Sequence, residues 1–119
     1  MDKINIKEKF TLFNTSWDPK IIGELNGQEI KIAKFNGDFV MHNHEEEDEL
    51  FYVIKGEIKI EFEDKIIKLK EGEMIIVPKG VNHKPSALNE AWVMMFEPKG
   101  TINTGGENNE LTKSIIEKI

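Results

Sequence analysis

The three histidines of this chain, His42, His44 and His83, are spaced in a pattern that can bind a metal ion. His42 and His44 are separated by one residue within an expected strand, so both imidazoles should leave the same face of that strand. Glu49 opens the next apolar run, and His83 follows a Pro-x-Gly turn. Imidazole together with carboxylate suits divalent metals such as Mn, Fe, Co, Ni, Cu and Zn. Convergence of these four side chains on one ion would leave one or two coordination positions open, as catalytic metal sites require.

The amino-acid composition excludes several kinds of functional site and partner. The 119 residues include 22 acidic and 16 basic side chains, which gives a formal net charge of -6. Every basic residue is a lysine, so no guanidinium group is available to grip a carboxylate or phosphate in bidentate fashion. The chain has no cysteine, which excludes disulfides, thiolate ligands and cysteine nucleophiles. An acidic balance without a basic stripe argues against nucleic acid or an anionic membrane as a partner.

No segment has the pattern of a targeting signal or a membrane span. The first nine residues mix charged and apolar side chains and contain no apolar core of the kind found in signal peptides. The longest apolar run, Ala91–Phe96, is far shorter than the roughly 20 residues that a membrane helix needs. We therefore expect a soluble cytoplasmic protein.

The elements that position the candidate ligands are expected to be short β-strands. Five segments have the length and apolar content of strands: Ile30–Phe35, Leu50–Ile54, Ile58–Glu63, Met74–Val77 and Ala91–Phe96. The first and third alternate apolar and charged residues, which is typical of a strand with one solvated face. The other three are continuously apolar, as for strands covered on both faces. Glycine turn signals recur at short spacing, and Asn26–Gly27 is a candidate two-residue hairpin turn, so an antiparallel sandwich or barrel is favoured over βαβ units.

The two ends of the chain differ from this middle part. Its length predicts a single domain over residues 1–119, with an N-terminal extension (1–19), a core barrel (about 20–98) and a tail (99–119). The spacing of Ile6, Phe10 and Phe13 fits a short helix or an added edge strand. The segment Glu110–Ile119 fits a short C-terminal helix or a frayed end.

The histidine pattern resembles the two sequence motifs of the cupin family. The first motif is matched by His42-Asn43-His44, four residues, Glu49, six residues and Gly56. The second is matched by Gly72, five residues, Pro78-Lys79-Gly80, two residues and His83. Two positions depart from the pattern, because Gly37 precedes His42 by four intervening residues rather than five and because Ala87 stands where the second motif usually ends in Asn. Neither position is a metal ligand, so the ligand set is unaffected.

The resemblance to small single-domain bacterial cupins carries expectations about fold, cofactor and assembly. It implies an all-β fold, the double-stranded β-helix or jelly-roll barrel. It implies one divalent transition metal (Mn, Fe, Ni, Co, Cu or Zn) inside that barrel, bound by His42, His44, Glu49 and His83. Small cupins also tend to pair, and the apolar strands of this chain make a homodimer the expected assembly.

The residues around the metal follow from strand alternation. Residues two positions away from a candidate ligand should lie on the same face of the strand as that ligand, which applies to residues near His42 and Glu49. In the last expected strand, about half of the apolar residues should face inward. We therefore expect the pocket wall to be formed by Val40, Phe51, Val53 and Met95, although ordinary core packing explains each of them equally well. Trp17 and Trp92 are expected in the core or at an interface rather than as platforms for a ligand.

Three classes of function remain open from the sequence. They are a metal-dependent enzyme acting on a small oxygenated molecule (a dioxygenase, isomerase or lyase), a non-catalytic small-molecule or metal-binding sensor, and a structural domain with a vestigial site. The intact ligand set favours the first two classes. An acid or base near the open coordination position would favour the enzyme, and Glu57, Glu61 and Glu97 are candidates between which strand periodicity cannot choose. The absence of arginine disfavours dicarboxylates and sugar phosphates as ligands. The pattern favours an enzyme over a binding module, without assigning its reaction, and with no nucleic acid or membrane as a partner.

Overall fold

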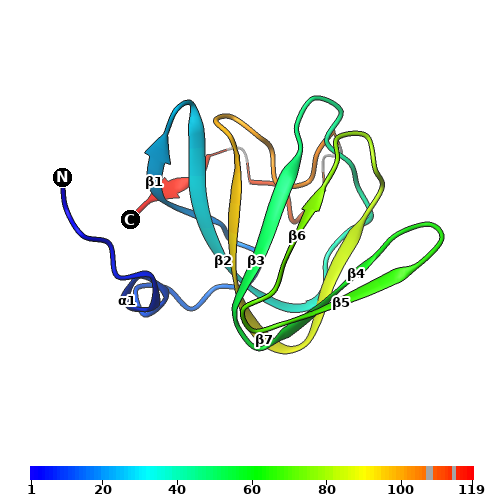
Figure 1. Ribbon diagram of the computed structural model, residues 1–119, viewed down its shortest axis with the longest axis horizontal. Helices are drawn as coiled ribbons and strands as arrows, with labels where there is room; N and C mark the ends of the chain where they lie inside the picture. Colours follow the sequence, from blue (N-terminus) through cyan, green and yellow to red (C-terminus); the bar gives the residue numbers. More distant parts are fainter. Residues whose placement is uncertain (107–108, 114) are drawn as a thin grey trace.

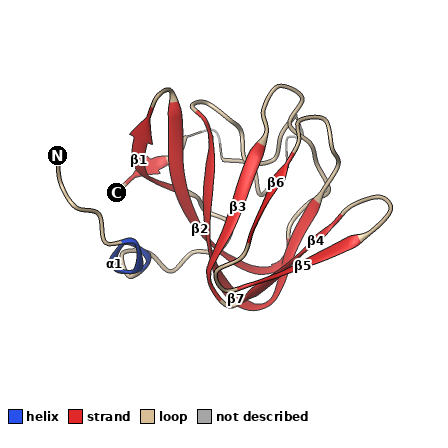
Figure 2. Ribbon diagram, viewed as in Figure 1, coloured by secondary structure: helices blue, strands red, loops and turns tan. Residues whose placement is uncertain are grey.

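Short strands joined by turns make up nearly all the regular structure. The computed structural model describes residues 1–106, 109–113 and 115–119. Its elements in chain order are α1 (Ile6–Phe10), β1 (Lys20–Leu25), β2 (Gln28–Asp38), β3 (Glu49–Lys55), β4 (Glu57–Glu61), β5 (Ile66–Lys70), β6 (Met74–Val77), β7 (Lys84–Pro98) and β8 (Glu117–Lys118) (Figures 1 and 2). The all-β fold predicted from the sequence is confirmed. No helix in the described residues is long and apolar enough to cross a membrane.

The 15-residue strand β7 organises the sheet. One edge of β7 pairs antiparallel with β2 over the length of that strand, from Gln28↔Pro98 to Asp38↔Ser86. Its other edge pairs with β4 near the N-terminal end and with β3 near the C-terminal end. The path β5-β4-β7-β2-β1-β8 is thereby joined through β7 to the pair β3-β6. This arrangement is consistent with a jelly roll, in which the β4–β5 hairpin lies at the opposite end of the molecule from α1 (Figure 1).

The expected strands and the expected hairpin turn are present, but the expected burial of one strand is wrong. The residues Asn26 and Gly27 connect β1 to β2 with φ values of 51° and 78°, the positive values that a type I′ hairpin turn requires. The prediction that β6 is covered on both faces is wrong, because Met74 and Ile76 are 56% and 55% exposed. Among the described strands β6 pairs with β3 alone, so it lies at an edge of the sheet.

A second apolar cluster covers the outer face of the sheet. The helical alternative for the N-terminal extension is the one that the structure adopts. The Asn5 side chain caps α1 by accepting a hydrogen bond from the Glu8 amide at 3.1 Å. The ring of Phe10, fully buried, stacks on Trp92 of β7 with 4.7 Å between ring centroids. The α1 segment therefore shields the face of β2 and β7 that points away from the main core.

The prediction of a short C-terminal helix is wrong for the described part of Glu110–Ile119. Glu117–Lys118 form strand β8, which pairs parallel to β1. The amide of Ile119 donates a hydrogen bond to the carbonyl of Ile21 at 3.0 Å, and the Ile119 side chain packs in the same cluster as Phe10. Pairing with an open sheet edge therefore overrides a weak local preference for helix.

Candidate metal centre

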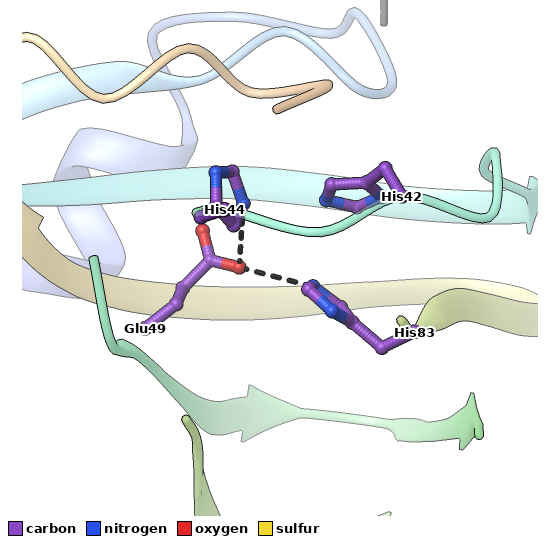
Figure 3. Close-up of side chains that lie close together, drawn as sticks. All are labelled: His42, His44, Glu49 and His83. Atoms are coloured by element: carbon purple, nitrogen blue, oxygen red, sulfur yellow. Dashed lines mark ion pairs between the residues drawn. The ribbon is translucent and has the colours of Figure 1, made fainter. Parts of the chain in front are cut away.

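The four candidate ligands come from three segments of the chain and point toward one another (Figure 3). His42 and His44 lie between β2 and β3, Glu49 is the first residue of β3, and His83 immediately precedes β7. The prediction that His42 and His44 lie within a regular strand is wrong, because residues 39–48 form a loop in which His42 alone makes a β-bridge. That bridge is made with His83, through backbone hydrogen bonds of 3.0 Å and 2.8 Å.

Further hydrogen bonds hold the loop in place. The carbonyl oxygen of His44 accepts a hydrogen bond from the Gly80 amide at 2.8 Å. The Asn43 side chain donates to the Asn82 side chain at 2.7 Å. These hydrogen bonds attach the loop that carries two of the candidate ligands, on both sides of Asn43, to the turn that precedes His83. Tertiary contacts, rather than a continuous strand, bring the histidines together.

The distances within the cluster fit a single bound ion. All four side chains are buried, and one ligand atom from each lies within 4.8 Å of every other. The Nε2 atoms of His44 and His83 are each 3.4 Å from Oε1 of Glu49 (Figure 3). Two ligand atoms that each lie about 2.1 Å from one ion are separated by about 3.4 Å at a tetrahedral angle.

Hydrogen bonds also orient the imidazole rings. The Nδ1 atoms of His42 and His83 each lie 2.9 Å from a backbone carbonyl oxygen, that of Val40 and that of Val81. We therefore assign the ring proton to Nδ1, which leaves the Nε2 lone pair free for a metal. Nε2 of His44, Nε2 of His83 and Oε1 of Glu49 are buried and have no hydrogen-bond partner. Buried polar atoms are rarely left unpaired, and a metal ion would satisfy all three. The residues present thus fit a divalent metal.

The electrostatic environment keeps the ligands in the protonation states that a metal needs. Burial, reinforced by the neighbouring His83, lowers the pKa of His42 from 6.5 to about 4, so its ring is neutral near pH 7. Burial acts to raise the pKa of the Glu49 carboxyl, but contacts with Glu97, His44 and His83 outweigh it and lower that pKa well below the usual value. Glu49 is therefore ionised, the state in which a carboxyl group can bind a metal ion.

Glu97 is a buried carboxyl group next to the ligand Glu49. Burial first, and then the negative charge of Glu49, raise the pKa of Glu97 well above its usual value, while Lys31 opposes the shift. One proton shared between the two carboxyl groups accounts for both shifts. Of the three glutamates that the sequence left open, Glu97 is 2% exposed, whereas Glu57 and Glu61 are exposed on β4.

A cavity of about 30 Å³ adjoins the cluster. Its wall is mostly apolar and is formed by Trp17, Pro19, Ala33, Phe35, Phe39, Phe51, Pro85 and Met95 together with the polar residues His42, Glu49, Glu97 and Asn103. Of the four expected wall residues, Phe51 and Met95 lie there. Val53 is fully buried in the main core, and Val40 is half-buried against that core.

Two residues near the site could not be assigned to it from the sequence. Trp17 was expected as a core or interface residue, and it does belong to the main core, but its ring also lines the cavity and stacks on Phe35 and Phe39 at 4.3 Å and 4.8 Å. Lys31 is buried, and its Nζ atom lies 2.9 Å from Oε1 of Glu97. No local motif distinguishes these residues. The signal for Lys31 is the pairing register of β2 with β7, which a single sequence does not contain.

Comparison with known proteins agrees with this geometry. Residues 30–97, more than half of the chain, match the sequence model of the cupin domain. The chain belongs to the cupin family. This cupin is 36% identical over 80 residues to the uncharacterized protein YdbB of Bacillus subtilis (strain 168). That match covers 66% of this chain and 65% of the relative, slightly less than two thirds of the relative's length.

Solved structures of other cupins share the fold over most of the chain. A cupin-2 domain containing protein from Shewanella frigidimarina is 46% identical, with a TM-score of 0.80 over 81% of this chain and 94% of its own. Protein NMB1881 from Neisseria meningitidis is 29% identical, with a TM-score of 0.76 over 82% of this chain and 100% of its own. The jelly-roll cupin fold is thus supported by sequence and structure together.

Proposed function

We propose that this cupin binds one divalent transition metal through His42, His44, Glu49 and His83 and acts as a metal-dependent enzyme on a small oxygenated molecule. The observation that carries the proposal is the convergence of the four buried ligand atoms within 4.8 Å of one another at the edge of a cavity. Three nitrogen donors and one carboxylate suit Mn, Fe, Co, Ni, Cu or Zn. When bound, such a metal supplies Lewis acidity toward the oxygen atoms of a ligand.

The residues of the chain itself provide the rest of the site. The apolar wall formed by residues such as Phe39 and Phe51 excludes bulk water from the cavity, which strengthens electrostatic interactions inside it. The buried carboxyl group of Glu97 lines the same cavity next to Glu49. A carboxyl group in this position is suited to act as a general acid or base, a role that a simple metal carrier does not need. The alternative, a non-catalytic metal-binding or small-molecule sensor, would share the metal site but show no turnover.

Metal analysis of purified variants tests the proposal. The protein is purified without chelator, and bound metals are quantified for the wild type, His42→Ala, His83→Ala and the control Lys84→Ala. Lys84 is adjacent to His83 but pairs with Asp38 outside the cluster. We expect about one metal per chain in the wild type and the control and a loss of metal in both histidine variants. Unchanged stoichiometric metal in both histidine variants would refute the assignment.

A further inference from the structure

Three buried glutamates form a row across the inner face of the sheet, and the row ends at the candidate ligand Glu49. The register of β2 with β7 places Glu29 directly opposite Glu97. The other edge of β7 pairs with β3 in a register that joins Leu50 to Phe96. One step beyond that pair, Glu49 lies opposite Glu97. Glu29, Glu97 and Glu49 are 5%, 2% and 4% exposed, so the interior contains three neighbouring carboxyl groups from three adjacent strands.

Lys31 holds the middle carboxyl group of this row in place. Its Nζ atom lies 2.9 Å from Oε1 of Glu97 and 3.7 Å from Oε1 of Glu29. The same atom donates a hydrogen bond to the carbonyl oxygen of Thr101 at 3.3 Å. Because Lys31 is 2% exposed, water does not compete for its ammonium group. Oε1 of Glu97 is thereby fixed, and Oε2 is the oxygen that remains available toward Glu49.

The contact between Glu97 and Glu49 requires a proton on one of the two carboxyl groups. Their side chains are joined by a hydrogen bond, and an ionised carboxylate can only accept such a bond. Oε1 of Glu49 lies 3.4 Å from Nε2 of both His44 and His83 (Figure 3), and a carboxyl group that binds a metal there is deprotonated. The proton therefore belongs to Glu97, in agreement with the raised pKa of that residue. Its Oε2 atom accepts no hydrogen bond from the described residues, as expected of an oxygen that donates one.

Stability alone does not require such a row. Like charges directly opposite each other on neighbouring strands are destabilising, and buried ionic groups can often be replaced by apolar residues without loss of stability. The row instead supplies direction. A carboxyl group with one oxygen held by Lys31 and the other directed at Glu49 restricts the rotation of the Glu49 carboxyl group.

We propose that Glu97 is a positioning residue for Glu49, the carboxylate ligand of the proposed metal. Lys31 holds Glu97, and Glu97 donates a hydrogen bond to Glu49, which keeps Oε1 of Glu49 directed at the space between the histidine rings. This role does not require Glu97 to contact the metal or a substrate. The inference rests on the proposed function, because Glu97 acts through a ligand of that metal.

Replacement of Glu97 by glutamine and by leucine tests the positioning role. In Glu97→Gln the side-chain carbonyl oxygen can accept from Lys31 while the amide donates to Glu49, whereas Glu97→Leu fills a similar volume and can do neither. Co(II) and Zn(II) are titrated into the chelator-treated wild type and variants in competition with a chromophoric chelator, and the visible absorption of the bound cobalt is recorded. We expect Glu97→Leu to weaken metal binding by about 10–100-fold and to alter the cobalt spectrum. We expect Glu97→Gln to keep the spectrum and a Kd within about threefold of the wild type.

Two further variants separate positioning from a general effect on the interior. Glu29→Leu is the same substitution at the other end of the row, next to the same lysine, but β7 separates Glu29 from Glu49. We expect it to lower the stability of the protein and to leave the Kd for cobalt within about threefold of the wild type. Lys31→Met/Glu97→Leu serves if Glu97→Leu does not fold, because it removes the lysine that the single variant leaves without Glu97. It should show the same loss of affinity and the same change of spectrum.

The outcomes separate this inference from the proposed function. Wild-type affinity and an unchanged cobalt spectrum in a folded Glu97→Leu or in the double variant would overturn the positioning role. Equal losses in Glu97→Gln and Glu97→Leu would also overturn it, because the charge of Glu97 and not its hydrogen bond would then matter. An equal loss in Glu29→Leu would show a general effect of the buried carboxyl groups and would likewise overturn it. A wild-type protein that takes up no cobalt, zinc or other divalent metal would overturn the proposed function itself.

Discussion

Replacement of the buried Lys31 by methionine tests how the ionic network behind the metal centre contributes to stability. Lys31 is 2% exposed, and its Nζ atom lies 2.9 Å from Oε1 of Glu97 and 3.7 Å from Oε1 of Glu29. Both carboxyl groups are also buried. Methionine fills a similar volume, but it leaves these carboxyl groups without their cation. Breaking a buried ion pair on one side costs about 3–5 kcal/mol, which is a large part of the total stability of a domain.

Urea denaturation of the chelator-treated protein, followed by far-UV circular dichroism, measures this loss. The double variant Lys31→Met/Glu97→Gln should lose less stability than Lys31→Met, because it leaves less unpaired charge in the interior. The loss in Lys31→Met should also be smaller at pH 5 than at pH 7. Lys31 opposes the upward shift of the pKa of Glu97, so its loss raises that pKa further. The added penalty is present at the higher pH and disappears as the pH falls through the wild-type pKa of Glu97, which already lies above the usual value.

Two results would refute this reasoning. Lys31→Met could remain within about 1 kcal/mol of the wild type at pH 7, which would place its contribution in the range of an exposed ion pair. Alternatively, the loss could be equal at pH 5 and pH 7, in which case no carboxyl group in the interior has been left without its cation.

Two other predictions concern the metal loop. Because the pKa of His42 is lowered from 6.5 to about 4, its contribution to the stability of the metal-free protein is complete above pH 6.5. It falls by about 3 kcal/mol toward pH 4, and a flat urea-denaturation profile between pH 7 and pH 4.5 would contradict this. In Gly105→Ala the new methyl group would meet the carbonyl oxygen of Asn43 at a residue with φ of 65°. We expect a loss of about 2–5 kcal/mol in thermal unfolding and weaker metal binding. Gly106→Ala, which meets no neighbouring atom within 4 Å, is the control, and an equal effect in both variants would contradict the explanation.

The ligand set was accessible from the sequence because its information is local. His42, His44 and Glu49 lie within eight residues, and His83 follows a recognisable turn. The strand expected around the first two histidines was wrong because spacing does not reveal what a segment pairs with. The loop is fixed by bonds to the turn at residues 80–83, far along the chain.

The surroundings of the site depend on the pairing register of the strands and on the position of each strand in the sheet. The periodicity of apolar residues in the sequence reveals neither of them. An apolar run such as Met74–Val77 has the same pattern at an edge as in the centre of a sheet, so its exposure was missed. The choice of Glu97 among three glutamates needed the pairing of Glu97 with Glu29 across β2 and β7. The C-terminal strand β8 likewise depends on an open edge of β1 that lies about 100 residues earlier in the chain.

The length of β7 has a consequence for the order in which the protein is assembled. β7 begins immediately after His83, carries Glu97 at its far end, and pairs with strands that were synthesised earlier. On the ribosome, residues 42–49 emerge well before the partners that fix their positions. Contacts between distant parts of a chain form slowly, so the metal centre is completed late, after β7 has aligned with β2 and β3. Until then the nascent chain exposes three histidines in a loose arrangement, so a metal ion that needs all four candidate ligands would be bound tightly only at the end of folding.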